Sequence, residues 1–341
     1  MMPRVAKPVN PKVQFRVMTA CLAISDQSIT EAVTILVAGR LVAFPTETVY
    51  GLGADATNAA AVARIFAAKQ RPAFNPLISH VASADAAFAL GQKNPIAAAL
   101  AAAFWPGPLT LILHRNDDCP VAMLTTAGLS KLGIRVPAHR SAQTLLQAFG
   151  KPIAAPSANP SGRISPSTAK HVLDGLGGRL DLVLDGGPCE SGLESTIIDC
   201  TGDIARLLRP GGITRDALAA ALATANCNPQ IDMAEPLADS ENPVAPGQLA
   251  SHYAPNAPVR LMANTSAADE ELIGFGAVSG AGKLALNLSP SADLVEAAAN
   301  LFSMLHAVDT ADIAKIAIAP IPDIGLGEAI NDRLRRAAAP R

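Results

Sequence analysis

The stretch from residue 41 to residue 80 concentrates side chains that could bind a phosphate. An apolar run breaks into a polar turn, and an alanine-rich segment then ends in two cations; the polar residues are Thr46, Glu47, Thr48, Lys69, Arg71, Asn75 and His80. Hydroxyls, cations and an imidazole gathered around one cleft suit an active site that uses phosphate esters. The alternative for Lys69 and Arg71 is a solvated helix end, where the helix dipole favours cations.

A second candidate anion site is the segment APSANPSGRISPST, residues 155–168. Small hydroxyl and amide residues surround Gly162 there, so backbone N–H groups and the side chains of Ser157, Ser161 and Ser165 could approach an anion closely. The alternative is a solvated turn rich in serine and proline.

Three more polar residues stand in or beside apolar strand-like runs. Arg135 lies inside GIRVPAH, where an unpaired guanidinium is costly and therefore implies a carboxylate or phosphate partner. The alternative is an internal salt bridge to an Asp or Glu. Ser195 stands at the mouth of the next such run, and Arg209 ends the one after it, before a Gly-Gly turn.

Familiar nucleotide motifs do not account for these residues. The segment GFGAVSGAGKLAL, residues 274–286, resembles a Walker A loop. However, Ala277 replaces its first glycine, and Leu284 stands where the motif requires a magnesium-binding Ser or Thr. We therefore expect no P-loop in this segment.

Composition narrows the class of protein. The 341 residues are 50% hydrophobic, which predicts a globular protein of about two domains at roughly 150 residues each. A net charge of -2 argues against a broadly basic nucleic-acid surface. With neither a membrane-length apolar run nor a secretory signal, the expected location is cytoplasmic, without a membrane partner. The five cysteines form no C-x-x-C and predict neither disulfides nor a metal site.

The elements that must position the polar residues predict an α/β fold with a mixed sheet. Helices are expected at 26–38, 59–68 and 95–104, and strands at 109–113, 131–137, 181–185, 195–200 and 205–210. Several strands are separated only by turns, which a purely parallel sheet does not allow.

The chain is predicted to divide into four parts. Residues 1–24 form an N-terminal arm, 25–222 a catalytic domain, 223–256 a linker or lid rich in Pro and Asn, and 257–341 a smaller α/β domain. Within the last part, strands are expected at 259–263, 283–288 and 315–321, alternating with helices.

The order of the polar segments resembles that of the YrdC-like family. The segments are PTETVYGLGA, K-x-R, NPLISH, WPGPLTLIL, IRVPAH, APSANPSG, ESTIID and LLRPG, and the linker ends in HYAP. The resemblance runs from about residue 25 to 341 and is to the long, two-domain form of the family. It implies a YrdC-like twisted mixed sheet with an open basic cleft, followed by a smaller Rossmann-like α/β domain.

The activity implied by the resemblance is that of an L-threonylcarbamoyladenylate synthase, a nucleotidyltransferase. Such enzymes make threonylcarbamoyl-AMP and pyrophosphate from L-threonine, bicarbonate or CO2, and ATP. Mg2+ is expected with the triphosphate, held by phosphates and water. The product supplies a separate threonylcarbamoyl transferase complex that modifies adenosine 37 of tRNA, and weak RNA binding is a further partner interaction that the resemblance allows.

The same resemblance assigns roles to individual positions. Catalysis falls to Lys69 and Arg71, through charge stabilisation. The ATP-binding positions are Lys69, Arg71, Asn75, Lys131, Ser157, Asn159, Ser165, Arg209 and Tyr253. The L-threonine positions are Thr48, His80, Arg135, Ala155 and Ser195, with Arg135 the natural partner of the threonine carboxylate. His80 could instead be a core histidine.

One departure and two alternatives stay open. The family's linker carries a basic and aromatic run before HYAP, whereas this chain has Gln248, Leu249, Ala250 and Ser251. The first alternative function is a YrdC-like paralogue that binds nucleotide, or double-stranded RNA or tRNA, without synthase activity. Its RNA affinity would fall steeply with salt. A protein carbamoyltransferase is the second.

Overall fold

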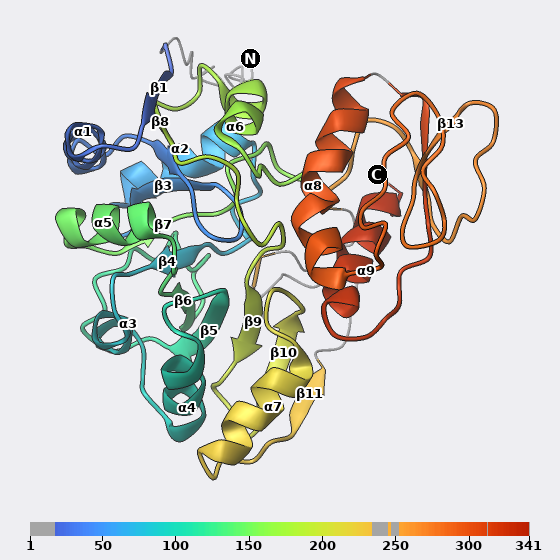
Figure 1. The fold of residues 1–341 in the computed structure, drawn as a ribbon. Helices are drawn as coiled ribbons and strands as arrows, with labels where there is room; N and C mark the ends of the chain where they lie inside the picture. The colour runs from blue at the N-terminus through green and yellow to red at the C-terminus, as the bar shows by residue number, and fades with distance from the viewer. Residues whose placement is uncertain (1–17, 234–244, 247–251, 312, 341) are drawn as a thin grey trace, which may run out of the picture.

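Two sheets organise the chain. The computed structural model describes residues 18–233, 245–246, 252–311 and 313–340. An eleven-stranded sheet forms the main unit and a three-stranded sheet the C-terminal unit, which lies to one side of it (Figure 1). The α/β class predicted from the sequence is confirmed.

The main sheet is mixed, as predicted. Its strands are β1 (Ala20–Ala23), β2 (Val42–Phe44), β3 (Gly51–Asp55), β4 (Ile78–His80), β5 (Leu109–His114), β6 (Lys131–Arg135), β7 (Ile153–Ala154), β8 (Leu182–Asp185), β9 (Thr196–Asp199), β10 (Ala205–Arg209) and β11 (Ile231–Met233). The spatial order is β1-β8-β2-β3-β7-β4-β6-β5-β9-β10-β11. The sheet combines antiparallel pairs, such as β2 with β3, and parallel pairs, such as β4 with β6.

Helices cover both faces of this sheet. They are α1 (Asp26–Val37), α2 (Ala59–Lys69), α3 (Ala84–Leu90), α4 (Pro95–Phe104), α5 (Arg140–Phe149), α6 (Ala169–Leu176) and α7 (Arg215–Thr224). Val42 and Phe44 pack with α1 and α5. Leu41 and Ala43 belong to the larger cluster that contains α2, α4 and α7. Successive residues of β2 thus serve opposite faces, which explains why the run LVAF is apolar throughout.

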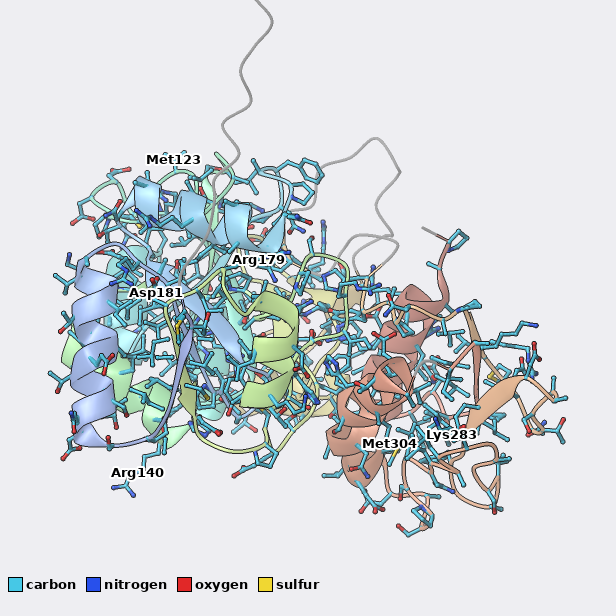
Figure 2. All side chains as sticks on the ribbon, turned by 90° about the horizontal axis from the view of Figure 1, so that it is seen from above. Met123, Arg140, Arg179, Asp181, Lys283 and Met304 are labelled. Atoms are coloured by element: carbon cyan, nitrogen blue, oxygen red, sulfur yellow. The ribbon has the colours of Figure 1, made fainter. Side chains whose placement is uncertain are left out.

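The C-terminal unit is built on three parallel strands. They are β12 (Val259–Arg260), β13 (Glu270–Ile273) and β14 (Lys315–Ile318), in the order β12-β14-β13, and they pack with α8 (Leu294–Thr310) and α9 (Leu326–Ala338). The strand expected at 283–288 is wrong. Leu284 and Ala285 each donate a backbone N–H to the Glu271 carboxylate at 2.8 Å. The Walker-like loop therefore encloses a carboxylate of the chain itself. Its Lys283 lies in the C-terminal unit (Figure 2).

Two short strands fall where the sequence predicted an arm and a linker. Strand β1 pairs with β8, although residues 20–23 were assigned to the N-terminal arm. Strand β11 pairs with β10 inside the span 223–256. Residues 1–17 and the linker residues 234–244 and 247–251 lie outside the described part of the chain. The predicted domain boundaries stay a prediction.

The C-terminal unit shares a hydrophobic core with the main unit. Val49, Ile164 and Leu193 of the main unit belong to one buried cluster with the core residues of α8 and α9. Both helices stand on the side of the C-terminal unit that faces the main unit (Figure 1). In the described residues, no helix is long and apolar enough to cross a bilayer.

Candidate active site

A cavity lies where several strand ends and loops of the main unit meet His252 and Tyr253, near the end of the predicted linker. Thr48 follows β2, His80 ends β4, Arg135 ends β6 and Arg209 ends β10. The predicted residues that line the cavity are Thr48, Arg71, His80, Arg135, Ala155, Ser157, Ser195, Arg209 and Tyr253. Residues that are far apart in the sequence therefore meet in one place.

Arg135 is both paired and open to the cavity. Its guanidinium lies 2.7 Å from a Glu47 carboxylate oxygen and donates to the Thr48 hydroxyl at 2.9 Å and to the Gly107 carbonyl at 3.3 Å. The internal salt bridge considered as an alternative therefore exists. It leaves Arg135 on the cavity wall, so the pairing holds the guanidinium in place rather than removing it from the site.

The turn after β2 orients Thr48. The Thr46 hydroxyl donates to the Val49 carbonyl at 2.7 Å and accepts the backbone N–H groups of Thr48 and Val49, each at 3.2 Å. This local hydrogen bonding by a threonine side chain stabilises the turn. It directs Thr48 toward Arg135 and places Thr46 on the cavity wall as well.

His80 is a neutral imidazole at physiological pH. Burial, and then the neighbouring Arg135 guanidinium, lower its pKa to about 3. Within the described residues its Nδ1 atom is buried and has no hydrogen-bond partner. A buried polar atom of this kind is uncommon, and one on a cavity wall is suited to bind a ligand. His80 thus lies at the cavity and not in the apolar core.

Arg71 is held at the cavity by the chain that follows it. Helix α2 ends in a left-handed Gln70, which reverses the chain. The Arg71 guanidinium then donates to the Asn75 carbonyl at 3.1 Å, to the Asn75 amide oxygen at 2.5 Å and to the Pro76 carbonyl at 2.9 Å. Asn75 is buried and does not line the cavity, so its contact positions Arg71.

Lys69 lies behind the cavity wall. Its ammonium donates to the Ser157 carbonyl at 2.6 Å and to the Asn159 carbonyl, and so ties α2 to the segment 155–168. Burial, and then the charge of Arg71, lower its pKa well below the usual value. The Asn159 side chain donates to the Arg163 carbonyl at 2.8 Å and fixes the same segment internally.

Arg209 connects the cavity floor to the linker. Its guanidinium donates to the Ser195 carbonyl at 2.9 and 3.2 Å and to the Ser195 hydroxyl at 3.2 Å. It also donates to the Pro246 carbonyl at 3.3 Å. The Ser195 hydroxyl lies 2.8 Å from that of Thr110.

Three cations on this side of the cavity have no carboxylate in direct contact among the described residues, although the charge of Glu194 acts on Arg209. Lys69, Arg71 and Arg209 are all less than 9% exposed and meet backbone, amide and hydroxyl oxygens. None forms a described salt bridge, in contrast to Arg135. Because isolated buried charges are costly, three of them together favour the binding of a polyanion.

Residues 252 and 253 close one side of the cavity. Both side chains are buried and line it. Burial, and then Arg71, lower the pKa of His252. The Tyr253 ring stacks on Phe302 of α8 at 5.6 Å, and its hydroxyl has no described partner. The divergent residues 248–251 lie outside the described part of the chain.

Like Lys69, Asn75 and Asn159, the predicted residues Lys131 and Ser165 do not line the cavity. Lys131 starts β6, whereas Arg135 ends it, and four residues of strand separate them by roughly 13 Å. Its ammonium lies 3.0 Å from Asp199. Ser165 is fully buried and donates to Glu194 at 2.5 Å.

Glu194 stands with Ser195 at the mouth of a predicted strand, but sequence reasoning gave it no role in the site. It lines the cavity and binds Arg333 of α9 at 2.8 Å. The signal in the sequence was a charged residue directly before Ser195, at the start of a predicted strand.

The described carboxylates do not gather into a metal site. No group of three or more His, Cys, Asp or Glu able to hold a metal occurs in the described chain. At the cavity, Glu47 faces Arg135, and Glu194 faces Ser165 and Arg333. Both of these carboxylates already have side-chain partners. The site therefore fits a metal ion whose ligands are phosphate oxygens and water.

Comparisons with known proteins agree with this architecture. The family model for Sua5, YciO and YrdC, described as telomere recombination, matches residues 34–211. The model for the threonylcarbamoyl-AMP synthase C-terminal domain matches residues 213–339. The threonylcarbamoyl-AMP synthase of Bacillus subtilis is 40% identical over 337 residues, covering 94% of this chain and 95% of that protein.

Pyrococcus abyssi provides both a similar sequence and a similar solved structure. The threonylcarbamoyl-AMP synthase of Pyrococcus abyssi is 39% identical over 322 residues, covering 89% of this chain and 92% of its own. The crystal structure of P. abyssi Sua5 complexed with L-threonine matches with a TM-score of 0.83 at 36% identity, covering 94% of this chain and 97% of that one. The chain thus belongs to the Sua5, YciO and YrdC family, in the two-domain form of the threonylcarbamoyl-AMP synthases.

Proposed function

We propose that this chain joins L-threonine, bicarbonate and ATP into L-threonylcarbamoyladenylate and releases pyrophosphate. The proposal rests on one observation: two chemically different groups of side chains line the same cavity. One is formed by Arg71 and Arg209, which make no described salt bridge, and the other by hydroxyls, a neutral histidine and the fixed guanidinium of Arg135. A triphosphate fits the first group and an amino acid the second.

The chemistry needs no nucleophilic side chain. The threonine amine adds to CO2, or to bicarbonate with loss of hydroxide, and gives up a proton to form a carbamate. A carbamate oxygen then attacks the α-phosphorus of ATP, and the bond to the leaving pyrophosphate breaks. Positioning and charge stabilisation account for catalysis of such a step.

The cation side serves the triphosphate in this proposal. Arg71 and Arg209 bind phosphate oxygens and stabilise the charge that develops as pyrophosphate leaves. Lys69, with Asn159, holds the Ser157 segment against the nucleotide, and Asn75 holds Arg71. Mg2+ bound to the triphosphate would neutralise phosphate charge, and the cavity residues bind the nucleotide around it. Ser165 and Lys131 have supporting roles behind the cavity, and Tyr253 covers the nucleotide.

The opposite side serves threonine. Arg135 pairs with the threonine carboxylate while Glu47 and Thr48 hold its guanidinium. His80, neutral at pH 7, offers a hydrogen bond through its free ring nitrogen. Ser195 and the backbone at Ala155 complete the subsite. The product would then pass to a transferase that modifies tRNA, and a cytoplasmic location is part of the proposal.

The test is pyrophosphate release by the purified chain with ATP, Mg2+ and bicarbonate, with and without L-threonine. Mass spectrometry should identify the adenylate. Arg71→Ala should abolish release, whereas Arg64→Ala, at an exposed position of α2, the helix that precedes Arg71, should not. ATP or RNA binding without threonine-dependent release would instead support the non-synthase paralogue.

A further inference from the structure

An arginine from the C-terminal unit lies in the wall of the proposed active site. The Arg333 side chain, on α9, is 0% exposed. It donates to Glu194 at 2.8 Å, to the Pro210 carbonyl at 2.8 Å and to its neighbour Asp332 at 2.8 Å. Glu194 and Pro210 are both main-unit residues, so this guanidinium joins the two units beside the cavity.

The partner of Arg333 is an ionised carboxylate that lines the cavity. Glu194 lines the cavity, and its second oxygen accepts the Ser165 hydroxyl at 2.5 Å. Burial alone would raise its pKa, but the charges of Arg333 and Arg209 outweigh that effect and lower it. An uncompensated carboxylate on this wall would repel a triphosphate. Arg333 supplies the first of these two compensating charges, and it does so from outside the main sheet.

Helix α9 also holds the residues that close the cavity. The Arg333 guanidinium lies 5.3 Å from the centre of the Tyr253 ring, in cation–π geometry. The His252 backbone N–H donates to the Arg336 carbonyl of the same helix at 3.2 Å. One helix therefore contacts the cavity wall through Glu194 and the cavity cover through residues 252 and 253.

We propose that Arg333 is a positioning residue of the reaction, which neutralises Glu194 and seats Tyr253 so that the cavity accepts ATP. This inference rests on the proposed synthase function. It makes the C-terminal unit part of the active site, because α9 provides both a charge that neutralises Glu194 and the cation that contacts the Tyr253 ring. Threonine binding is centred on Arg135, whose described contacts are to Glu47, Thr48 and Gly107 and not to Arg333 or Glu194.

The experiment compares steady-state kinetics of Arg333→Gln, Glu194→Gln and the double variant. Arg333→Gln should raise KM for ATP by roughly tenfold or more, because it leaves a buried carboxylate unpaired beside the phosphates. KM for threonine should change by less than about threefold. Adding Glu194→Gln to Arg333→Gln should recover most of the loss in ATP KM, since the double variant removes the unpaired charge.

Two further variants guard against a purely structural explanation. Arg333→Lys keeps the charge and should retain an ATP KM near that of the parent chain. Arg335→Gln, on the same helix with a side chain 59% exposed, should match the parent throughout. Additive effects of Arg333→Gln and Glu194→Gln, or an unchanged ATP KM in Arg333→Gln, would overturn the proposal.

A second readout does not depend on activity. Without substrates, amide hydrogen exchange in the peptide around residues 252–255 should be faster in Arg333→Gln than in the parent chain, and unchanged in Arg335→Gln. Equal exchange in all three would contradict the seating of Tyr253 by Arg333. If the parent chain made no adenylate, the proposed function would fail, while this exchange measurement would still decide whether α9 holds the cavity cover.

Discussion

Histidine 80 shows how one buried side chain links the site to the stability of the fold. Its pKa is lowered from the ordinary 6.5 to about 3, first by burial and then by Arg135. The folded chain therefore keeps His80 neutral between these values, while the unfolded chain protonates it. Because the unfolded state binds the extra proton, the folded state loses stability as pH falls from 6.5 toward 3, by up to about 1.4 kcal/mol per pH unit.

His80→Gln should consequently reduce this acid sensitivity. Glutamine has no titrating group, so the variant should lose less stability than the parent chain between pH 6.5 and 4. Urea unfolding at a series of pH values measures the difference directly. Identical pH profiles for the two chains would show that His80 is not buried in neutral form.

Thr48 offers a narrower test of the amino-acid side. Thr48→Val keeps the side-chain shape but removes the hydroxyl that accepts from Arg135 at 2.9 Å. Losing one such hydrogen bond costs about 0.5–1.5 kcal/mol, so KM for threonine should rise by roughly 3- to 10-fold while KM for ATP stays constant. Thr48→Ser, which retains the hydroxyl, is the control. A change in ATP KM alone would place Thr48 on the nucleotide side.

The sequence could indicate which residues bear chemistry but not all of their partners. Arg135 inside an apolar run predicted a partner, and Glu47 provides it. Arg333 bonds Glu194 across 139 residues, and no local pattern reports which arginine of a helix docks against a distant unit. Lys131 does not line the cavity, because it stands at the other end of β6 from Arg135, and its role in ATP binding stays a prediction.

At the scale of elements, the hairpin of β2 and β3 positions the turn that bears Thr48. Gly53 lies in β3, where an added Cβ would come within 2.9 Å of Phe44 and 3.0 Å of Ile153. Gly53→Ala should therefore destabilise the fold by about 1–3 kcal/mol. It should also reduce activity, because the Phe44 ring packs edge-on against His80 at 6.3 Å.

Gly202→Ala is the matched control for this variant. Its Cβ would have one neighbour, at 3.9 Å, so its effect on the free energy of unfolding should stay within about 0.5 kcal/mol. Urea unfolding of both variants gives the comparison. Equal stability of the two variants would mean that Phe44 and Ile153 can shift to accommodate a Cβ at position 53 at little cost.

Apolar runs predicted the long elements better than the short ones. The alanine-rich segments became α2 and α4, and the runs at 109–113 and 205–210 became β5 and β10. Strand β3 was not predicted; it contains Gly51 and Gly53, where close packing leaves little room for a Cβ. In the C-terminal unit, the apolar run at 283–288 was wrongly predicted as a strand. Its backbone instead donates hydrogen bonds to the side chain of Glu271, and a local apolar pattern does not report such a distant partner.

At the scale of the whole molecule, Gly192 marks where the two units touch. It has φ of +63°, and a Cβ there would lie 2.3 Å from the Ala298 carbonyl of α8. Gly187, in the same loop, has φ of +80° and no atom within 4 Å of such a Cβ. The two positions share the backbone strain and differ in the contact with the C-terminal unit.

Comparing Gly192→Ala with Gly187→Ala therefore isolates the contribution of the interface. Gly187→Ala should cost about 1–2 kcal/mol for a left-handed alanine. Gly192→Ala should cost about 1–3 kcal/mol more, because the α8 backbone must move. Since Leu193 and Glu194 follow directly, that movement should also weaken ATP binding in Gly192→Ala and not in Gly187→Ala. Denaturant unfolding and ATP titration of the two variants measure both effects, and equal values would mean that the C-terminal unit adjusts to the main unit without disturbing the site.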